Sequence, residues 1–260
     1  PLAATEKNIT HPLRPPQTRE ARSDGPHLGR VPVFVAQPAG SPAPAPGHAA
    51  ARCPLGFSTA MDASRPLVVY TMDPVKDLLP LETDRLFFRR FSESDLEAMH
   101  AYQSREDYAQ HAWRGPRSWE HSERVIAEHR GPRAFLHDGD TIRYAFSAHD
   151  DPEGLYGEIV LTLVDAESRQ IEMGWVVSPD HAGRGYAGEA AIAAIDACFE
   201  RLDAHRVFAR LDALNHSSIK VCERIGMRRE AELRESHLQL GEWRTELIYA
   251  ALRSDRISAD

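Results

Sequence analysis

A glycine-rich loop between a strand-like segment and a long helical segment is the feature that most constrains this chain. Residues 174–190 read GWVVSPDHAGRGYAGEA, in which Gly183, Gly185 and Gly188 have the spacing G-x-G-x-x-G. Glycine lets backbone N–H groups approach an anion closely, and the N-terminus of the following helix adds unpaired donors. The segment therefore predicts a site for a phosphate-bearing ligand. The alternative is a loop of small residues that serves only tight helix packing.

Four helices, one long and three shorter, are predicted from apolar spacing and capping residues. Apolar side chains recur every three or four positions over residues 187–202, which indicates one long amphipathic helix. Ser94 and Glu97 have the spacing of a capping box, Ser118 precedes a second helix, and Asn215 precedes a short third one. The side chains expected to face inward from the shorter helices are Leu96, Met99, Tyr102, Trp119, Ile126, Ile219, Cys222 and Ile225.

Strand-like segments separated by turns predict an antiparallel meander before the loop and a hairpin at the end of the chain. Turn-rich pieces at 138–140 and 150–154 divide the meander. The expected hairpin turn is Gly241-Glu242. The segments expected to form strands are 85–91, 134–137, 142–146, 156–164, 171–177, 207–211, 233–240 and 243–252.

The glycine spacing by itself also fits a dinucleotide-binding fold. In such a fold the strand ends at the first glycine and an acidic residue follows about 20 residues later. Here residues 178–182 separate the strand from Gly183, Asp212 only weakly imitates the acidic residue, and too little chain remains for further parallel units. A P-loop is excluded because no Lys-Ser/Thr pair follows the glycines.

Composition divides the chain into a tail and a body. Residues 1–60 hold 11 of the 18 prolines and carry 6 basic against 3 acidic residues. The remaining residues carry 25 basic against 36 acidic residues, so the body has a net charge of −11. We expect a disordered Pro/Ala-rich tail or extension over residues 1–75 and one catalytic domain over residues 76–255. Met61 is the first methionine, so the native start is expected at Met61 or Met72.

The acidic body excludes several classes of protein. Nucleic-acid binding as the main activity is disfavoured, because such affinity comes from clustered Lys and Arg. No run of about 18 apolar residues exists, so no membrane-spanning helix is expected. The three cysteines form no C-x-x-C pair, and the 13 histidines form no H-E-x-x-H or comparable cluster, so neither a disulfide framework nor a metal site is predicted. We therefore expect a cytoplasmic protein.

Two motifs in the expected order resemble the GNAT acetyltransferases, specifically the RimJ/RimL-like branch. The first is the strand followed by Pro179-Asp180-x-x-Gly-Arg-Gly-Tyr-Ala, and the second is the Asn-His-Ser-Ser-Ile segment that begins at Asn215. The segments 81–86, 171–175 and 241–244 extend the resemblance over residues 80–253. It implies the α+β GNAT fold, which is a single domain with a central, mostly antiparallel, mixed and twisted sheet flanked by helices.

The resemblance also implies an enzyme that uses acetyl-CoA. The pantetheine arm would pair with the strand before the loop, and the loop would hold the pyrophosphate. Ala182 stands where the family often has Gln or Arg, which removes a side-chain contact but leaves the backbone cradle. Arg184, Lys220 and Arg224 are candidates for the CoA phosphates. The cofactor-binding residues implied are Trp175, Val176, Val177, Gly183, Arg184, Gly185, Tyr186, Ala187, Gly188, Asn215 and Ser218.

Acetyl transfer to an amine needs a neutral nucleophile, because a lysine-type amine has a pKa of about 10.4. Glu158 and Glu172, on adjacent expected strands, are the candidate bases, although each could be an ordinary strand carboxylate. A backbone N–H near Val176 is the expected oxyanion donor. Many relatives have a tyrosine acid where this chain has Cys222, so Ser218 or Cys222 is the candidate proton donor, or the thiolate leaves unassisted. Cys222 could also be only a buried apolar residue.

The acceptor expected is a primary amine on a protein N-terminus or on a small cationic molecule, which attacks directly in a ternary complex. The alternatives are a non-catalytic CoA-binding regulatory module and a nicotinamide-dependent oxidoreductase. The aromatic residues Tyr102, Trp113 and Trp119 could line the acceptor pocket or belong to the core. We expect a monomer or a homodimer.

Overall fold

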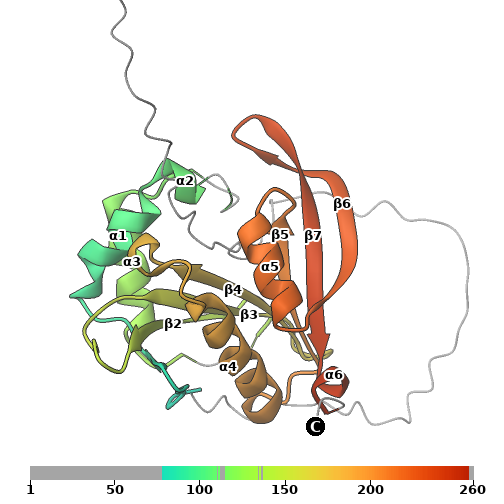
Figure 1. The fold of residues 1–260 in the computed structure, drawn as a ribbon, viewed down its shortest axis with the longest axis horizontal. Helices are drawn as coiled ribbons and strands as arrows, with labels where there is room; N and C mark the ends of the chain where they lie inside the picture. The colour runs from blue at the N-terminus through green and yellow to red at the C-terminus, as the bar shows by residue number, and fades with distance from the viewer. Residues whose placement is uncertain (1–77, 110, 112–114, 134, 136, 258–260) are drawn as a thin grey trace, which may run out of the picture.

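The computed structural model describes residues 78–109, 111, 115–133, 135 and 137–257. The expected tail at residues 1–75 lies outside these residues. The described part contains a mixed sheet of seven strands with helices on both faces (Figure 1). No helix in these ranges has the length and apolarity needed to cross a membrane. The elements in chain order are β1 (Leu86–Arg89), α1 (Asp95–Gln103), α2 (Glu106–Ala109), α3 (Trp119–His129), β2 (Thr141–Ala148), β3 (Gly157–Asp165), β4 (Gln170–Val177), the 3₁₀ turn η1 (Pro179–His181), α4 (Tyr186–Arg201), β5 (Arg206–Asp212), α5 (His216–Arg224), β6 (Arg228–Gln239), β7 (Glu242–Leu252) and α6 (Arg253–Ile257).

The strand order β1-β2-β3-β4-β5-β7-β6 confirms the α+β sheet expected from the sequence. Strands β1 to β4 form the antiparallel meander, and β4 and β5 form the parallel pair, with α4 as their crossover. A doubly wound dinucleotide fold needs several parallel strands, so this sheet excludes the nicotinamide-dependent oxidoreductase.

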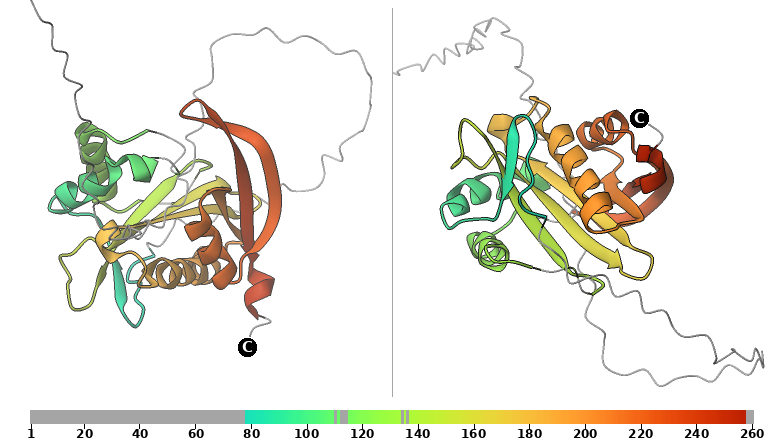
Figure 2. Two further views of the ribbon diagram at one scale, coloured as in Figure 1. Left: turned by 45° about the horizontal axis from the view of Figure 1, so that its top comes forward. Right: turned by 90° about the horizontal axis from the view of Figure 1, so that it is seen from below.

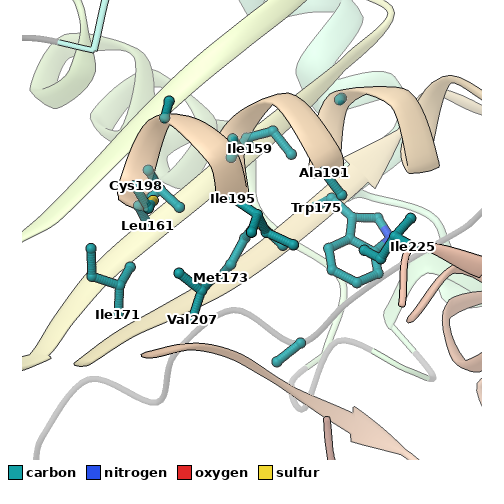
Figure 3. Close-up of a cluster of buried hydrophobic side chains, with 14 of the residues drawn as sticks. Ile159, Leu161, Ile171, Met173, Trp175, Ala191, Ile195, Cys198, Val207 and Ile225 are labelled. Atoms are coloured by element: carbon teal, nitrogen blue, oxygen red, sulfur yellow. The ribbon is translucent and has the colours of Figure 1, made fainter. Parts of the chain in front are cut away.

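The helix α4 packs on one face of the sheet because its apolar stripe matches the inward residues of β3 and β4. Figure 3 shows Ile195 and Cys198 of α4 against Leu161 of β3 and Met173 of β4, all fully buried. Burying each such aliphatic side chain contributes about 1.5–3 kcal/mol. The helices α1 to α3 lie on the opposite side of the strands from α4 and α5 (Figure 2, right).

The hairpin differs from expectation in its turn. Gln239 pairs with Glu242, so the turn residues are Leu240 and Gly241, with φ of 50° and 85°, and not Gly241-Glu242. A two-residue type I′ turn needs positive φ at both positions, which glycine adopts freely at the second. The first strand of the hairpin also begins earlier than expected, at Arg228.

Three local predictions for the N-terminal half are wrong. Ser94 makes no capping bond with its side chain, since its hydroxyl contacts that of Ser92 at 2.6 Å. Trp119 does not face inward but is 41% exposed, and its indole N–H donates to Glu123. Phe135, within the expected strand 134–137, lies outside any strand.

The cap at α5 gives a direct test of local stability. The side chain of Asn215 accepts a hydrogen bond from the N–H of Ser218 at 3.1 Å. Asn215→Ala is expected to lower the free energy of unfolding by about 1 kcal/mol, because the substitution removes this bond. Ser94→Ala is the matched control, since Ser94 makes no such bond and its loss is expected to change the free energy of unfolding much less. Urea unfolding of both variants measures the difference, and equal losses would contradict the assignment of the cap.

Candidate active site

The two parallel strands in the middle of the sheet pair along only part of their length, which leaves a slot between their backbone edges. Pairing between β4 and β5 covers only residues 170–172 with residues 206–208. Beyond these residues β4 runs on to Val177 and β5 runs on to Asp212. The residues Trp175, Val176 and Val177 therefore lie on the edge of β4 that faces the slot, and an extended chain could pair with this edge.

The glycine loop lies at the end of this slot and presents unpaired donors. Gly183 and Gly185 have φ of 75° and 85°, a backbone region that other residues rarely adopt, and Gly185 is the N-cap of α4. Within the described part of the chain, residues 183–188 donate no backbone hydrogen bond. Such a helix N-terminus attracts anions.

A pocket of about 320 Å³ joins this loop to α5. Ser217, Lys220 and Arg224 of α5 line it together with the glycines and Ala187. The loop supplies N–H donors and α5 supplies two cations, so the pocket suits a ligand with several phosphate oxygens. The structure thus brings Lys220 and Arg224 to the loop, whereas Arg184 is exposed beside it.

The first turn of α4 is held by the segment just before β1 in a way that the sequence did not indicate. The guanidinium of Arg85 is ion-paired with Glu189 and donates to the carbonyl of Arg184 at 3.1 Å. The hydroxyl of Thr83 donates to Glu189 at 2.5 Å. Burial acts to raise the pKa of Glu189, but these hydrogen bonds outweigh it and lower the pKa. Arg85 thus balances an acidic charge that would otherwise repel an anion at this helix N-terminus.

An aromatic stack lines the other side of the loop. The rings of Tyr156 and His181 are parallel, with centroids 3.6 Å apart, and Tyr186 lies 5.4 Å from Tyr156. Burial lowers the pKa of His181, and the nearby Arg184 lowers it further. A neutral ring at position 181 therefore packs against Tyr156 and helps to fix the loop.

Glu172 lies where β4 and β5 separate, on the last residue pair that joins the two strands. It is 4% exposed, and no hydrogen bond or ion pair of its side chain is found among the described residues. Burial raises the pKa of its carboxyl to about 7, Arg210 lowers it, and Glu246 raises it further. A buried carboxylate with this pKa can accept a proton near neutral pH.

Glu158 lies on the same face of the sheet, but its carboxylate is already hydrogen-bonded to other side chains. Its carboxylate accepts hydrogen bonds from Arg143 at 3.0 Å, Gln103 at 3.1 Å and the hydroxyl of Tyr102 at 3.2 Å. Its side chain is 0% exposed. The structure therefore separates the two candidate bases, with Glu172 unpaired and Glu158 inside a buried network.

The two candidate proton donors are both enclosed in the protein. Ser218 and Cys222 are 0% exposed, and Cys222 belongs to the core beneath α4. Burial raises the pKa of the Cys222 thiol well above its usual range. A thiol with such a pKa is a weak proton donor, which favours the core role.

The aromatic residues expected near an acceptor pocket fall in different places. Tyr102 is buried and lines a second pocket, of about 260 Å³, between α1 and η1. Trp119 is on the surface, and Trp113 lies outside the described residues. No group of three or more potential metal ligands occurs in the described ranges.

Comparison with known proteins identifies the family. The model of the acetyltransferase (GNAT) domain matches residues 85–228, more than half of the chain. An uncharacterized N-acetyltransferase, YnaD, of Bacillus subtilis is 29% identical over 175 residues, which are 67% of this chain and 98% of that protein. The spermidine N(1)-acetyltransferase of Escherichia coli K12 is 26% identical over 109 residues, which are 42% of this chain and 57% of the relative.

Solved structures agree with the fold. A GNAT-family acetyltransferase from Bacillus anthracis has a TM-score of 0.59 and 28% identity, covering 67% of this chain and 98% of its own. The spermidine N-acetyltransferase from Vibrio cholerae, solved with CoA and spermine, has a TM-score of 0.58 and 20% identity, covering 67% and 99% of the two chains. At 20% identity the second similarity shows the fold alone. The RimJ/RimL-like branch stays a prediction.

The separated strands, the glycine loop at a helix N-terminus and the family match over residues 85–228 lead to one conclusion. The chain belongs to the GNAT family and is an N-acetyltransferase.

Proposed function

We propose that this enzyme transfers an acetyl group from acetyl-CoA to a primary amine by direct attack in a ternary complex. The proposed catalytic domain is residues 76–255. The proposed acceptor is a small amine or a protein N-terminus. The net charge of −11 outside the first 60 residues and the spermidine acetyltransferases among the relatives support a cationic acceptor.

The residues of the slot and loop fit CoA. The unpaired N–H groups of residues 183–188 would hold the pyrophosphate, with Lys220 and Arg224 near its charges. Trp175, Val176 and Val177 would pair with the pantetheine arm along the open edge of β4. Asn215 and Ser218, at the start of α5, would face the cofactor. When bound, acetyl-CoA supplies the thioester that the amine attacks.

Glu172 is the proposed general base. Its carboxylate lies where β4 and β5 separate and has no hydrogen bond or ion pair among the described residues. Its pKa of about 7 lets it take the proton of the attacking amine directly or through water. A backbone N–H near Val176 is the proposed donor to the developing oxyanion. The full burial of Ser218 and Cys222 favours departure of the thiolate without a side-chain acid.

The position of Glu172 at the residue where β4 and β5 stop pairing is the observation that carries this proposal. Release of free thiol from acetyl-CoA, measured across a panel of primary amines, tests it. A saturable acceptor with stoichiometric thiol release is expected. CoA binding without turnover on any amine would contradict the proposal.

Gly185→Ala is expected to weaken CoA binding about tenfold. An alanine at φ +85° is strained by about 1–2 kcal/mol, and relief of that strain would move the N–H groups of the loop. Gly139→Ala is the matched control, because Gly139 has φ +91° in a turn outside the loop and its Cβ would meet no atom within 4 Å. Calorimetric titration with CoA should show the loss of affinity for Gly185→Ala alone. Equal affinities for both variants would count against binding of CoA by the N–H groups of the glycine loop.

A further inference from the structure

Three buried polar atoms that have no hydrogen-bond partner among the described residues meet at the carboxyl end of β5. They are Oδ2 of Asp212, Nδ1 of His111 and Nε of Arg244. Asp212 is 1% exposed, and its Oδ2 lies 3.6 Å from His111 Nδ1 and 3.9 Å from Arg244 Nη1, which are ion-pair distances but too long for hydrogen bonds. Its other oxygen accepts from the N–H of Leu214 at 2.8 Å. Buried polar atoms are rarely left unpaired, so this cluster lacks a partner group.

The cluster lies on the same face of the sheet as Glu172. Glu172 pairs with Phe208, and Asp212 follows Phe208 by four residues on β5, so side-chain alternation places both carboxylates on one face. At about 3.3 Å per residue, the two positions are about 13 Å apart along the strand. The other face is covered by α4, whose core includes Leu211. An acceptor amine must therefore approach Glu172 from the side on which Asp212 lies.

The surroundings of the cluster place it between α2 and the hairpin. The side chain of Gln239, at the end of β6, donates to the carbonyl of Ala109 at 2.9 Å, two residues before His111. Arg244 is on β7, where it also pairs with Glu242 at 2.9 Å. The hairpin, which extends beyond the rest of the sheet in Figure 1, thus contacts α2 beside the unpaired atoms.

The unpaired atoms define the chemistry of the missing group. Oδ2 of Asp212 can only accept a hydrogen bond when ionised. Burial acts to raise the pKa of this carboxyl, but the nearby His111, the N–H of Leu214 and Arg244 lower it. Nε of Arg244 can only donate. A second ammonium group would approach the guanidinium of Arg244, and a carboxylate would approach Asp212. An uncharged group that both donates and accepts satisfies both atoms, and the peptide amide is such a group.

We propose, building on the proposed acetyl transfer, that Asp212 and Arg244 with His111 bind an amide of the acceptor about 13 Å from its reacting amine. A peptide supplies an N–H and a C=O at each residue and extends about 3.3–3.6 Å per residue. The distance of about 13 Å corresponds to nearly four residues, so the fourth residue of a peptide acceptor reaches the cluster when its N-terminal amine is at Glu172. The preferred acceptor is then peptide-like, and a simple polyamine lacks the amide.

Three probes of different chemistry test this inference: tetra-alanine amide, n-butylamine and 1,8-diaminooctane. Wild-type protein is expected to acetylate the tetrapeptide with the highest kcat/KM. Asp212→Asn turns the acceptor Oδ2 into a donor with little change of shape, and it is expected to lower kcat/KM at least tenfold for the tetrapeptide and less than twofold for butylamine. Arg244→Met should show the same selectivity. Asp203→Asn, the same substitution at an exposed site at the C-terminal end of α4, is the control.

Calorimetric titration of the tetrapeptide amide into CoA-saturated protein gives a readout that does not need turnover. Binding that weakens about tenfold in Asp212→Asn, with a thermal midpoint near that of wild type, supports the site. The inference is overturned if the two amines lose as much kcat/KM as the peptide, if the diamine is preferred, or if Asp212→Asn leaves peptide affinity unchanged because only water fills the cluster. Absence of turnover with every amine, together with selective peptide binding, would refute the proposed acetyl transfer and leave the binding site supported.

Discussion

Replacing Glu172 with glutamine is expected to lower kcat by about 100-fold to 10,000-fold, the usual contribution of a general base. Glutamine keeps the shape of the side chain but cannot accept the proton of the amine. The affinity for CoA should change little, because the glycine loop and α5 are remote from this side chain. Stopped assays of thiol release at saturating acceptor measure kcat, and Glu167→Gln, in the exposed turn before β4, is the matched control. An unchanged kcat would remove Glu172 from the mechanism.

The pKa of Glu172 makes the same prediction testable by pH. The base is the carboxylate, so wild-type kcat should rise about tenfold per pH unit below pH 7 and become flat above it.

The effect of rising pH on the stability of the fold has the opposite sign. A carboxyl whose pKa is higher in the folded state than the usual 4.5 binds its proton more tightly when folded, so its contribution to stability is lost as pH rises toward 7 and above. Glu172→Gln should therefore be more stable than wild type at pH 8 and similar to it near pH 4.

The general architecture of this enzyme could be predicted from local sequence patterns. The period of the apolar residues indicated α4, and the alternation before it indicated the meander, because burial on one face of an element leaves a regular spacing. The glycine loop could be located for the same reason, since positive φ at Gly183 and Gly185 requires glycine.

Contacts between distant segments could not be predicted in this way. Arg85 and Glu189 are 104 positions apart, and no local pattern indicates that the segment before β1 supports the start of α4. The different states of Glu158 and Glu172 have the same origin. Each is an acidic residue on a strand, and only the packing of α1 beside Glu158 and the separation of β5 near Glu172 distinguish them. The unpaired atoms of Asp212 and Arg244 likewise depend on how β5, the hairpin and the region after α2 meet.

Glu158→Leu is expected to lower the free energy of unfolding by about 3–5 kcal/mol, because it leaves the buried guanidinium of Arg143 without its carboxylate. It also removes the acceptor for Tyr102 and Gln103. In a domain of this size the loss corresponds to a fall of about 10 °C in the thermal midpoint. Differential scanning calorimetry measures the midpoint, and turnover well below it should stay near that of wild type, which is the opposite of the result expected for Glu172→Gln.

The double variant Arg143→Met/Glu158→Leu separates the ion pair from general damage to the core. Much of the loss in Glu158→Leu comes from the unpaired cation, so removal of Arg143 as well should restore a large part of the stability. Additive losses in this cycle would show that packing around position 158, and not the charge of Arg143, carries the effect. Glu158→Leu could instead lose turnover while its thermal midpoint stays near that of wild type. That result would make Glu158 the base again, because the loss of activity could not then come from a less stable fold.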